Sequence, residues 1–87
     1  MSVRKKEAMG KEDTLRNIVA DISRVAPASI KGGSDLQKDL GIDSFNAVEI
    51  LVAVEREYGI RIERAEAFGV RTFNDILALV KRYLGGQ

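Results

Sequence analysis

The stretch DLGIDSFNAVEILVAVEREYG, residues 39–59, joins a glycine-containing turn to a long run without glycine or proline. Within that run, apolar residues recur at the spacing of one helical face. They are Ala47, Ile50, Leu51, Val54 and Tyr58. The spacing predicts a helix over residues 44–58, which Gly59 ends because glycine readily takes the left-handed conformation found after helices.

A second apolar row, Phe45, Val48 and Val52, follows the same predicted helix. A helix on the surface of a small domain needs only one apolar stripe to face the core. The row is therefore either further core or a contact surface for a partner. The sequence leaves both open.

The residues before this helix are expected to form a first helix over residues 14–26, followed by a long loop. Asp13 or Thr14 can cap the start of the first helix, and Pro27 stops it. A loop of this length is unusual in so small a domain, so we expect its apolar residues to pin it to the core. The apolar residues of the first helix are Leu15, Ile18, Val19, Ile22 and Val25, and those of the loop are Ile30, Leu36, Leu40 and Ile42.

Two more helices are expected after Gly59. The segment ERAEAF, residues 63–68, is long enough for a short third helix. The last helix opens at Thr72, with Asp75 in the position of a capping box, and ends at Gly85. Its apolar stripe is Phe73, Ile76, Leu77, Val80, Tyr83 and Leu84. The sequence thus predicts an all-α four-helix bundle with a long loop between helices one and two and a short third helix.

The composition excludes several classes of chemistry. The 87 residues suit one small domain and include no cysteine and no histidine, so we expect no metal site, no thiol or imidazole catalysis and no enzyme activity of the chain's own. No apolar run reaches the length of a membrane span or a signal sequence, and we expect a cytoplasmic protein without stable membrane insertion. Nothing suggests a coiled-coil seam, so a monomer is expected.

The net charge of +1 conceals a division along the chain. Residues 35–66 hold eight acids against four bases, a net of −4, and the remainder holds five acids against ten bases, a net of +5. The basic residues near the start predict a flexible, solvated tail over residues 1–12 ahead of a single domain over residues 13–87. The tail has four basic residues, Arg4, Lys5, Lys6 and Lys11, and no aromatic residue beside them. This is too little to indicate a nucleic-acid binding surface, so no nucleic-acid partner is expected.

Ser44 stands at the start of the predicted second helix, directly after Asp43. Either residue can cap that helix, and a capping box built on Ser44 would want an acid or amide where Ala47 stands. Capping by Asp43 instead would leave the Ser44 hydroxyl free at the first helical position. A phosphate esterified there would lie in the favourable field of the helix N-terminus. From these residues alone, Ser44 is either a plain cap or a chemical handle.

The longer stretch DLGIDSFNAVEILVAVEREYGIRI, residues 39–62, resembles the acyl carrier protein family in its Asp-Ser dipeptide behind a Leu-Gly turn, and the likeness extends from Leu15 to Leu84. The resemblance implies that 4′-phosphopantetheine is attached to Ser44 by a phosphopantetheinyl transferase that uses coenzyme A, with Asp43 orienting the serine. It implies a carrier that holds acyl groups as thioesters in fatty-acid, polyketide or other specialised lipid or secondary-metabolite biosynthesis.

The resemblance also implies that the second helix docks the transferase and the acyl-loading, synthase or acyltransferase enzymes. The implied partner-binding residues are Phe45, Val48, Glu49, Val52, Glu55 and Arg56, although the acids also suit an ordinary solvated face. The net positive charge and the aromatic residue after the serine depart from the family and favour a specialised carrier. Two alternatives remain: a helical adaptor that binds a partner through its second helix, and an aminoacyl or peptidyl carrier.

Overall fold

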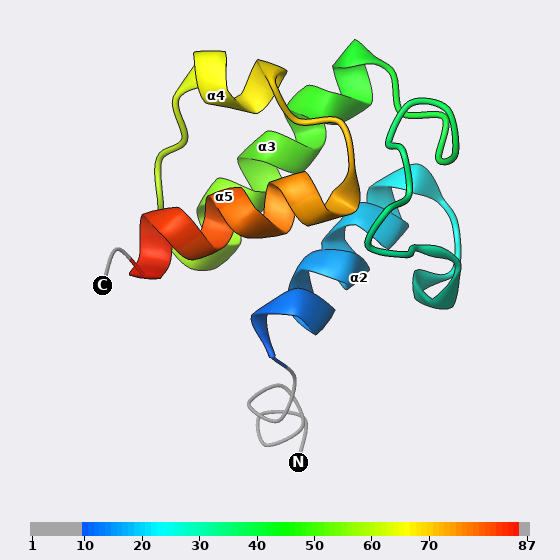
Figure 1. The fold of residues 1–87 in the computed structure, drawn as a ribbon, viewed down its shortest axis with the longest axis horizontal. Coiled ribbons are helices and arrows are strands. Elements are labelled where there is room, and N and C mark those ends of the chain that lie inside the picture. Colours follow the sequence, from blue (N-terminus) through cyan, green and yellow to red (C-terminus); the bar gives the residue numbers. More distant parts are fainter. Residues whose placement is uncertain (1–9, 86–87) are drawn as a thin grey trace.

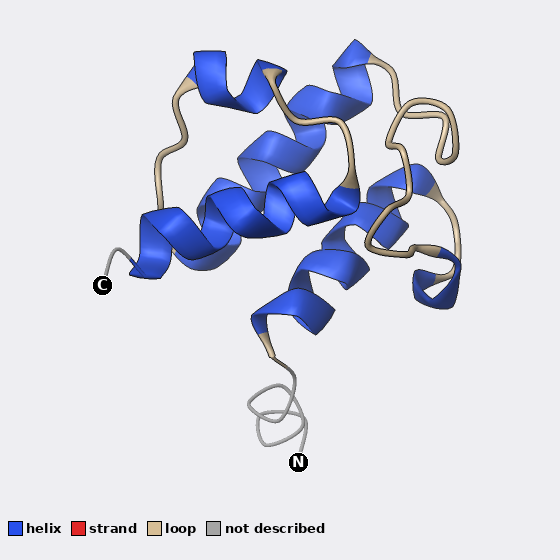
Figure 2. Cartoon of the chain, viewed as in Figure 1, coloured by secondary structure: helices blue, strands red, loops and turns tan. Residues whose placement is uncertain are grey.

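The computed structural model describes residues 10–85, and its regular structure there is helical without strands (Figures 1 and 2). The four α-helices and one short 3-10 helix are α2 (Lys11–Ser23), η1 (Pro27–Ser29), α3 (Ser44–Tyr58), α4 (Arg64–Phe68) and α5 (Phe73–Gly85). In Figure 1, α2 lies along the lower edge, α4 along the upper edge, and the long loop at the end away from the C terminus. The predicted all-α four-helix bundle with a long first loop and a short third helix is confirmed.

The core draws on the three long helices and on three isoleucines outside them, Ile30, Ile42 and Ile62. The helical contribution is Leu15, Val19 and Ala20 from α2, Ile50 and Val54 from α3, and Phe73, Ile76, Leu77 and Val80 from α5. All of these residues except Ala20 lie on the predicted stripes, because a period of 3.6 residues keeps them on one face of each helix. None of the helices within residues 10–85 is long and apolar enough to cross a membrane.

The predicted bounds of the first helix were wrong by three residues at each end. It begins at Lys11, after Gly10, without a side-chain cap from Asp13 or Thr14. It ends ahead of Pro27, because proline disfavours a helical backbone at the residue before it, and the chain turns at Arg24 in the left-handed conformation. Residues 11 and 12 of the predicted tail are thus helical, while residues 1–9 lie outside the described residues.

The long loop is fastened to the start of α5 by backbone hydrogen bonds. The first two amides of α5, of Phe73 and Asn74, donate to the carbonyls of Ser34 (3.2 Å) and Gly32 (2.9 Å). In the opposite direction, the amide of Leu36 donates to the carbonyl of Arg71 at 2.9 Å. The first amides of a helix have no partner inside it, so the loop satisfies groups that α5 would otherwise leave open.

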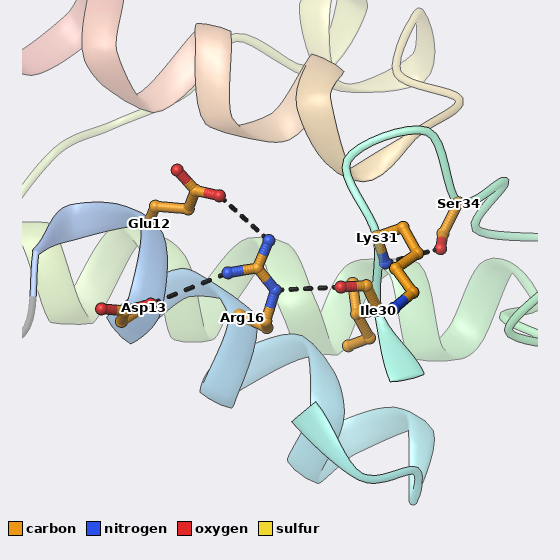
Figure 3. Close-up of polar contacts among 6 residues, drawn as sticks. All are labelled: Glu12, Asp13, Arg16, Ile30, Lys31 and Ser34. Atoms are coloured by element: carbon orange, nitrogen blue, oxygen red, sulfur yellow. Dashed lines mark hydrogen bonds and ion pairs between the residues drawn. The ribbon is translucent and has the colours of Figure 1, made fainter. Parts of the chain in front are cut away.

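Arg16 joins α2 to both the loop and α5, and Figure 3 shows its contact with the loop. Its Nε donates to the carbonyl of Ile30 at 3.0 Å, and Nη2 pairs with the Glu12 carboxylate, also at 3.0 Å. Its guanidinium carbon lies 4.7 Å from the centre of the buried Phe73 ring. Together with the buried side chains of Ile30 and Ile42, these contacts confirm that the loop is pinned to the core.

Two tyrosines fasten the ends of the bundle. The Tyr58 hydroxyl donates to the carbonyl of Lys11 at 2.9 Å, and burial together with the nearby Glu57 charge raises the pKa of Tyr58 to about 12. The Tyr83 hydroxyl donates to the Glu66 carboxylate and accepts the amide of Glu63 at 3.1 Å. α4 is therefore held to the end of α5 by side chains.

The predicted capping box at the start of α5 is present. The Thr72 hydroxyl accepts the amide of Asp75 at 3.2 Å, and the Asp75 carboxylate accepts the amides of Arg71 and Thr72, both at 3.0 Å. The Arg71 and Thr72 amides hold the pKa of Asp75 below its ordinary value of 3.8. The ionised carboxylate is thus the form that the fold favours.

We expect Gly59→Ala to lower the free energy of unfolding by about 1 kcal/mol, because Gly59 ends α3 at φ 65° and a side chain strains this left-handed backbone. Gly33→Ala is the control, since Gly33 does not have positive φ and an added Cβ would meet nothing within 4 Å. Urea unfolding of both variants measures the difference. Equal effects of the two substitutions would contradict the assignment of Gly59 as a strained helix end.

We expect Asp75→Asn to lower stability by about 0.5 kcal/mol at neutral pH, a figure reduced for solvent screening at this exposed site. Because the folded state lowers the pKa of Asp75, its charge stabilises the fold above pH 3.8, and this contribution is lost as the pH falls through the lower, folded pKa. Urea unfolding from neutral pH to below that range should show the two proteins converging in acid. A constant difference would mean that Asp75 acts only through its shape.

Candidate functional site

Helix α3 begins at Ser44 because Asp43 caps it. Asp43 has an extended backbone, and its Oδ1 accepts the amide of Asn46 at 2.8 Å. Ser44 is thus the first helical residue, its side chain is exposed, and its hydroxyl forms no hydrogen bond within residues 10–85. The sequence allowed either Asp43 or Ser44 as the N-cap of α3, and in the structure the N-cap is Asp43. The Ser44 hydroxyl is therefore available for chemistry.

The turn before Ser44 is tightly bonded. Asp35 Oδ1 accepts the amides of Gln37 (3.0 Å) and Lys38 (2.8 Å), and Asp39 Oδ2 accepts the amide of Asp35 at 2.7 Å. The Lys38 amide is the main reason that the pKa of Asp35 lies below its ordinary value. The turn then passes through Gly41 at φ 68° to the buried Ile42, two residues before Ser44. Ser44 is therefore presented from a fixed position.

A groove of about 340 Å³ opens beside Ser44, between the turn, the start of α3 and the end of α4. These segments lie at the upper edge of Figure 1, next to the loop. The polar residues of the groove are Asp35, Gln37, Lys38, Asp43, Ser44 and Arg71. The apolar residues are Leu36, Ile42, Ala47, Phe68 and Val70. The groove can thus receive a group that is charged at one end and apolar along its length.

The second apolar row of α3 is exposed to solvent. Phe45 is 71% exposed, Val48 45% and Val52 44%, whereas Ile50 and Val54 on the opposite side of the helix are 5% and 1% exposed. Of the two interpretations that the sequence allowed for this row, the structure excludes further core. The row is an apolar surface without a covering element among the described residues.

The charged residues predicted to flank this row differ in their surroundings. Glu49 and Arg56 are exposed, and Glu49 accepts the side-chain amide of Asn46 at 3.0 Å. Glu55 is partly buried, and its carboxylate accepts the amide of Ile62 at 2.8 Å. Glu55 thus has a structural role in holding the chain after α3, and Glu49 is the acid more open to a partner.

Sequence reasoning missed Phe68, Lys38 and Arg71 as neighbours of Ser44. Phe68 is 80% exposed at the end of α4, although it is large and apolar. A phenylalanine without a large apolar partner at helical spacing in ERAEAF was the one available signal. No local pattern marks the two cations, because they reach the groove only through the folding of the loop and of the segment before α5.

A smaller apolar cavity lies under α3 and is lined by residues of α3, α4, α5 and their connections. Its volume is about 90 Å³, below the roughly 150 Å³ of a cavity that holds benzene. Leu51, Val54 and Ile76 line it, and Leu36 and Val70 border both this cavity and the groove. The two spaces are thus neighbours across a shared apolar wall.

Comparison with known proteins assigns the family. Residues 13–80 match the family described as "Phosphopantetheine attachment site". The chain is 36% identical to polyketide-8 synthase acyl carrier protein 2 of Streptomyces avermitilis over 90% of its own length and 88% of that protein. It is 32% identical to an acyl carrier protein of Campylobacter hominis (79% and 87% covered) and 31% identical to a meromycolate extension acyl carrier protein of Mycolicibacterium aurum (78% and 70% covered). The matched segment contains Asp43, Ser44 and helices α3 and α4 entire, and the chain belongs to the acyl carrier protein family, whose members carry phosphopantetheine.

Proposed function

We propose that Ser44 Oγ carries 4′-phosphopantetheine and that the chain presents acyl groups to enzymes of polyketide or fatty-acid biosynthesis. The observation that carries this proposal is the exposed hydroxyl at the first residue of α3, which forms no hydrogen bond within residues 10–85 and lies inside the segment that matches the attachment-site family. When bound, the group supplies a thiol that holds the acyl cargo as a thioester.

The residues around Ser44 fit such a group. In the attachment step, the bond between Ser44 Oγ and phosphorus forms as the phosphoanhydride bond of coenzyme A breaks. The adenosine bisphosphate leaves with the electron pair, and the hydroxyl proton of Ser44 passes to the transferase. Asp43 fixes the start of α3 through the amide of Asn46 and so fixes the direction of Ser44. The groove beside Ser44 leaves space for a long substituent.

The exposed row Phe45, Val48 and Val52 supports a docking role for α3. Large apolar side chains at a free surface gain energy when a partner covers them, and Glu49 on the flank offers a carboxylate to a basic patch. Such a small surface suits rapid encounter and release. We propose that the transferase and the acyl-loading, synthase or acyltransferase enzymes share this surface and that Arg56 contributes to their choice.

We also propose a specialised carrier, rather than a general fatty-acid carrier. The support is Phe45 directly after Ser44, which makes the start of α3 more apolar, and the net charge of +1 of the whole chain, which weakens its long-range attraction to basic partners. In this proposal the chain acts as a monomer in the cytoplasm, and it is a substrate of its enzymes without a reaction of its own.

We expect the wild-type chain to gain the mass of one phosphopantetheine when it is incubated with coenzyme A and a broad-specificity transferase, and Ser44→Ala to gain nothing. Intact-mass spectrometry measures both. Circular dichroism should show that the variant stays folded, since Asp43 and not Ser44 caps α3. A folded wild type without the added mass under a range of transferases would favour a helical adaptor over a carrier.

We expect Glu49→Lys to slow the transfer of phosphopantetheine roughly tenfold at low salt, because it reverses a charge beside the docking row. Asp21→Lys is the matched control, since Asp21 is also exposed and the change in net charge is the same, but it lies on α2. Rates at limiting carrier concentration, measured at low and high salt, test the difference. Equal slowing by both variants would mean that net charge matters and the α3 surface does not.

A further inference from the structure

The start of α3 brings a negative charge next to the attachment point. Asp43 directly precedes Ser44, and both line the groove. A phosphodiester at Ser44 carries one negative charge, so it would stand beside a carboxylate of like sign. Two like charges at close range repel unless the site also supplies a cation or donors. A phosphate that rests in the groove would therefore gain from positive charge there, in addition to the field of the α3 N-terminus.

Two cations line the same groove, Lys38 from the turn before α3 and Arg71 from the segment between α4 and α5. Both are exposed, and within residues 10–85 neither has a carboxylate at ion-pair distance. An ammonium and a guanidinium without a paired acid are the groups best suited to bind phosphate oxygens.

Two acids that feel the charge of these cations are occupied by backbone amides. Asp35 Oδ1 accepts the amides of Gln37 and Lys38, and Asp75 Oδ2 accepts those of Arg71 and Thr72. The Lys38 amide is the largest influence that lowers the pKa of Asp35, and the charges of Lys38 and Arg71 act in the same direction. Both cations thus lie within electrostatic reach of Asp35 without forming a contact pair with it.

The groove and the apolar row lie on opposite sides of Ser44. Ala47, one turn along α3, lines the groove, whereas Phe45, Val48 and Val52 do not. On the groove side, Phe68 and Val70 form an apolar wall next to Arg71. An arm drawn toward the cations would therefore lie toward the end of α4 and leave the row uncovered.

We propose that Lys38 and Arg71 bind the phosphate of the arm attached to Ser44 and direct the pantetheine chain along the groove against Phe68 and Val70. This inference rests on the proposed modification of Ser44 and adds to it a resting place for the arm. The charged end of the groove matches the phosphodiester, and the apolar wall matches the dimethyl-bearing part of pantetheine.

The test compares the unmodified and modified forms by amide NMR after intact mass has confirmed complete modification. In the wild type, attachment should shift the amides of residues 68–71 and of Lys38 as well as those next to Ser44. In the double variant Lys38→Gln, Arg71→Gln, the shifts at residues 68–71 should be mostly lost while those next to Ser44 remain. Raising the salt from about 0.1 to about 1 M, which shortens the screening length from about 10 to 3 Å, should weaken the wild-type shifts in the same way.

The control is the double variant Arg61→Gln, Lys81→Gln, which removes the same two charges from exposed positions outside the groove and should keep the wild-type shifts. Shifts confined to the neighbours of Ser44, or unchanged when Lys38 and Arg71 are replaced, would overturn this inference and leave the proposed function standing. A wild type that gains no mass would overturn the proposed function, and this inference with it. The spectra of the unmodified variants show whether each remains folded.

Discussion

The position of Ser44 depends on one backbone pairing, between the long loop and the segment that begins α5. The loop carbonyls of Gly32 and Ser34 accept the first amides of α5, and the amide of Leu36 returns a bond to Arg71. Leu36 in turn accepts the amide of Ile42 at 2.9 Å, two residues before Ser44. Four hydrogen bonds thus connect α5 to the start of α3 without a strand or a disulfide. Backbone amides and carbonyls that lie against the core must be hydrogen-bonded. This pairing meets that need and so fixes the conformation of the loop, which a loop of this length would not have on its own.

That pairing also decides what surrounds the serine. It brings Lys38 and Arg71 to the groove that Ser44 lines, since Lys38 belongs to the loop and Arg71 to the segment paired with it. Arg16 reinforces it from α2 through the carbonyl of Ile30 (Figure 3) and through the ring of Phe73. The groove is therefore a product of the loop's attachment to α5, and its charges come from residues that are distant in sequence.

The sequence was sufficient where the physics is local. Periodicity placed α3 and α5 and their buried faces. The dipeptide Asp43-Ser44 left two candidates for the N-cap of α3, and in the structure the N-cap is Asp43. It was insufficient where the outcome depends on distant segments. Glu55 was interpreted as a docking acid, and only the folded chain shows that its carboxylate takes the amide of Ile62. Lys38 and Arg71 carry no local signal, and they line the groove with Ser44 only after the loop has closed on α5.

The exposure of the second row on α3 follows from the size of the chain. The buried face of α3 is shared with α2 and α5, and α4, which has only five residues, contributes to the groove on the other side of Ser44. To cover Phe45, Val48 and Val52 as well, the domain would need another helix outside α3, and residues 10–85 provide none. Phe45 and Val48 therefore remain exposed within one turn of Ser44. An enzyme that approaches this row reaches the serine in the same encounter, because helix α3 holds both in a fixed relation.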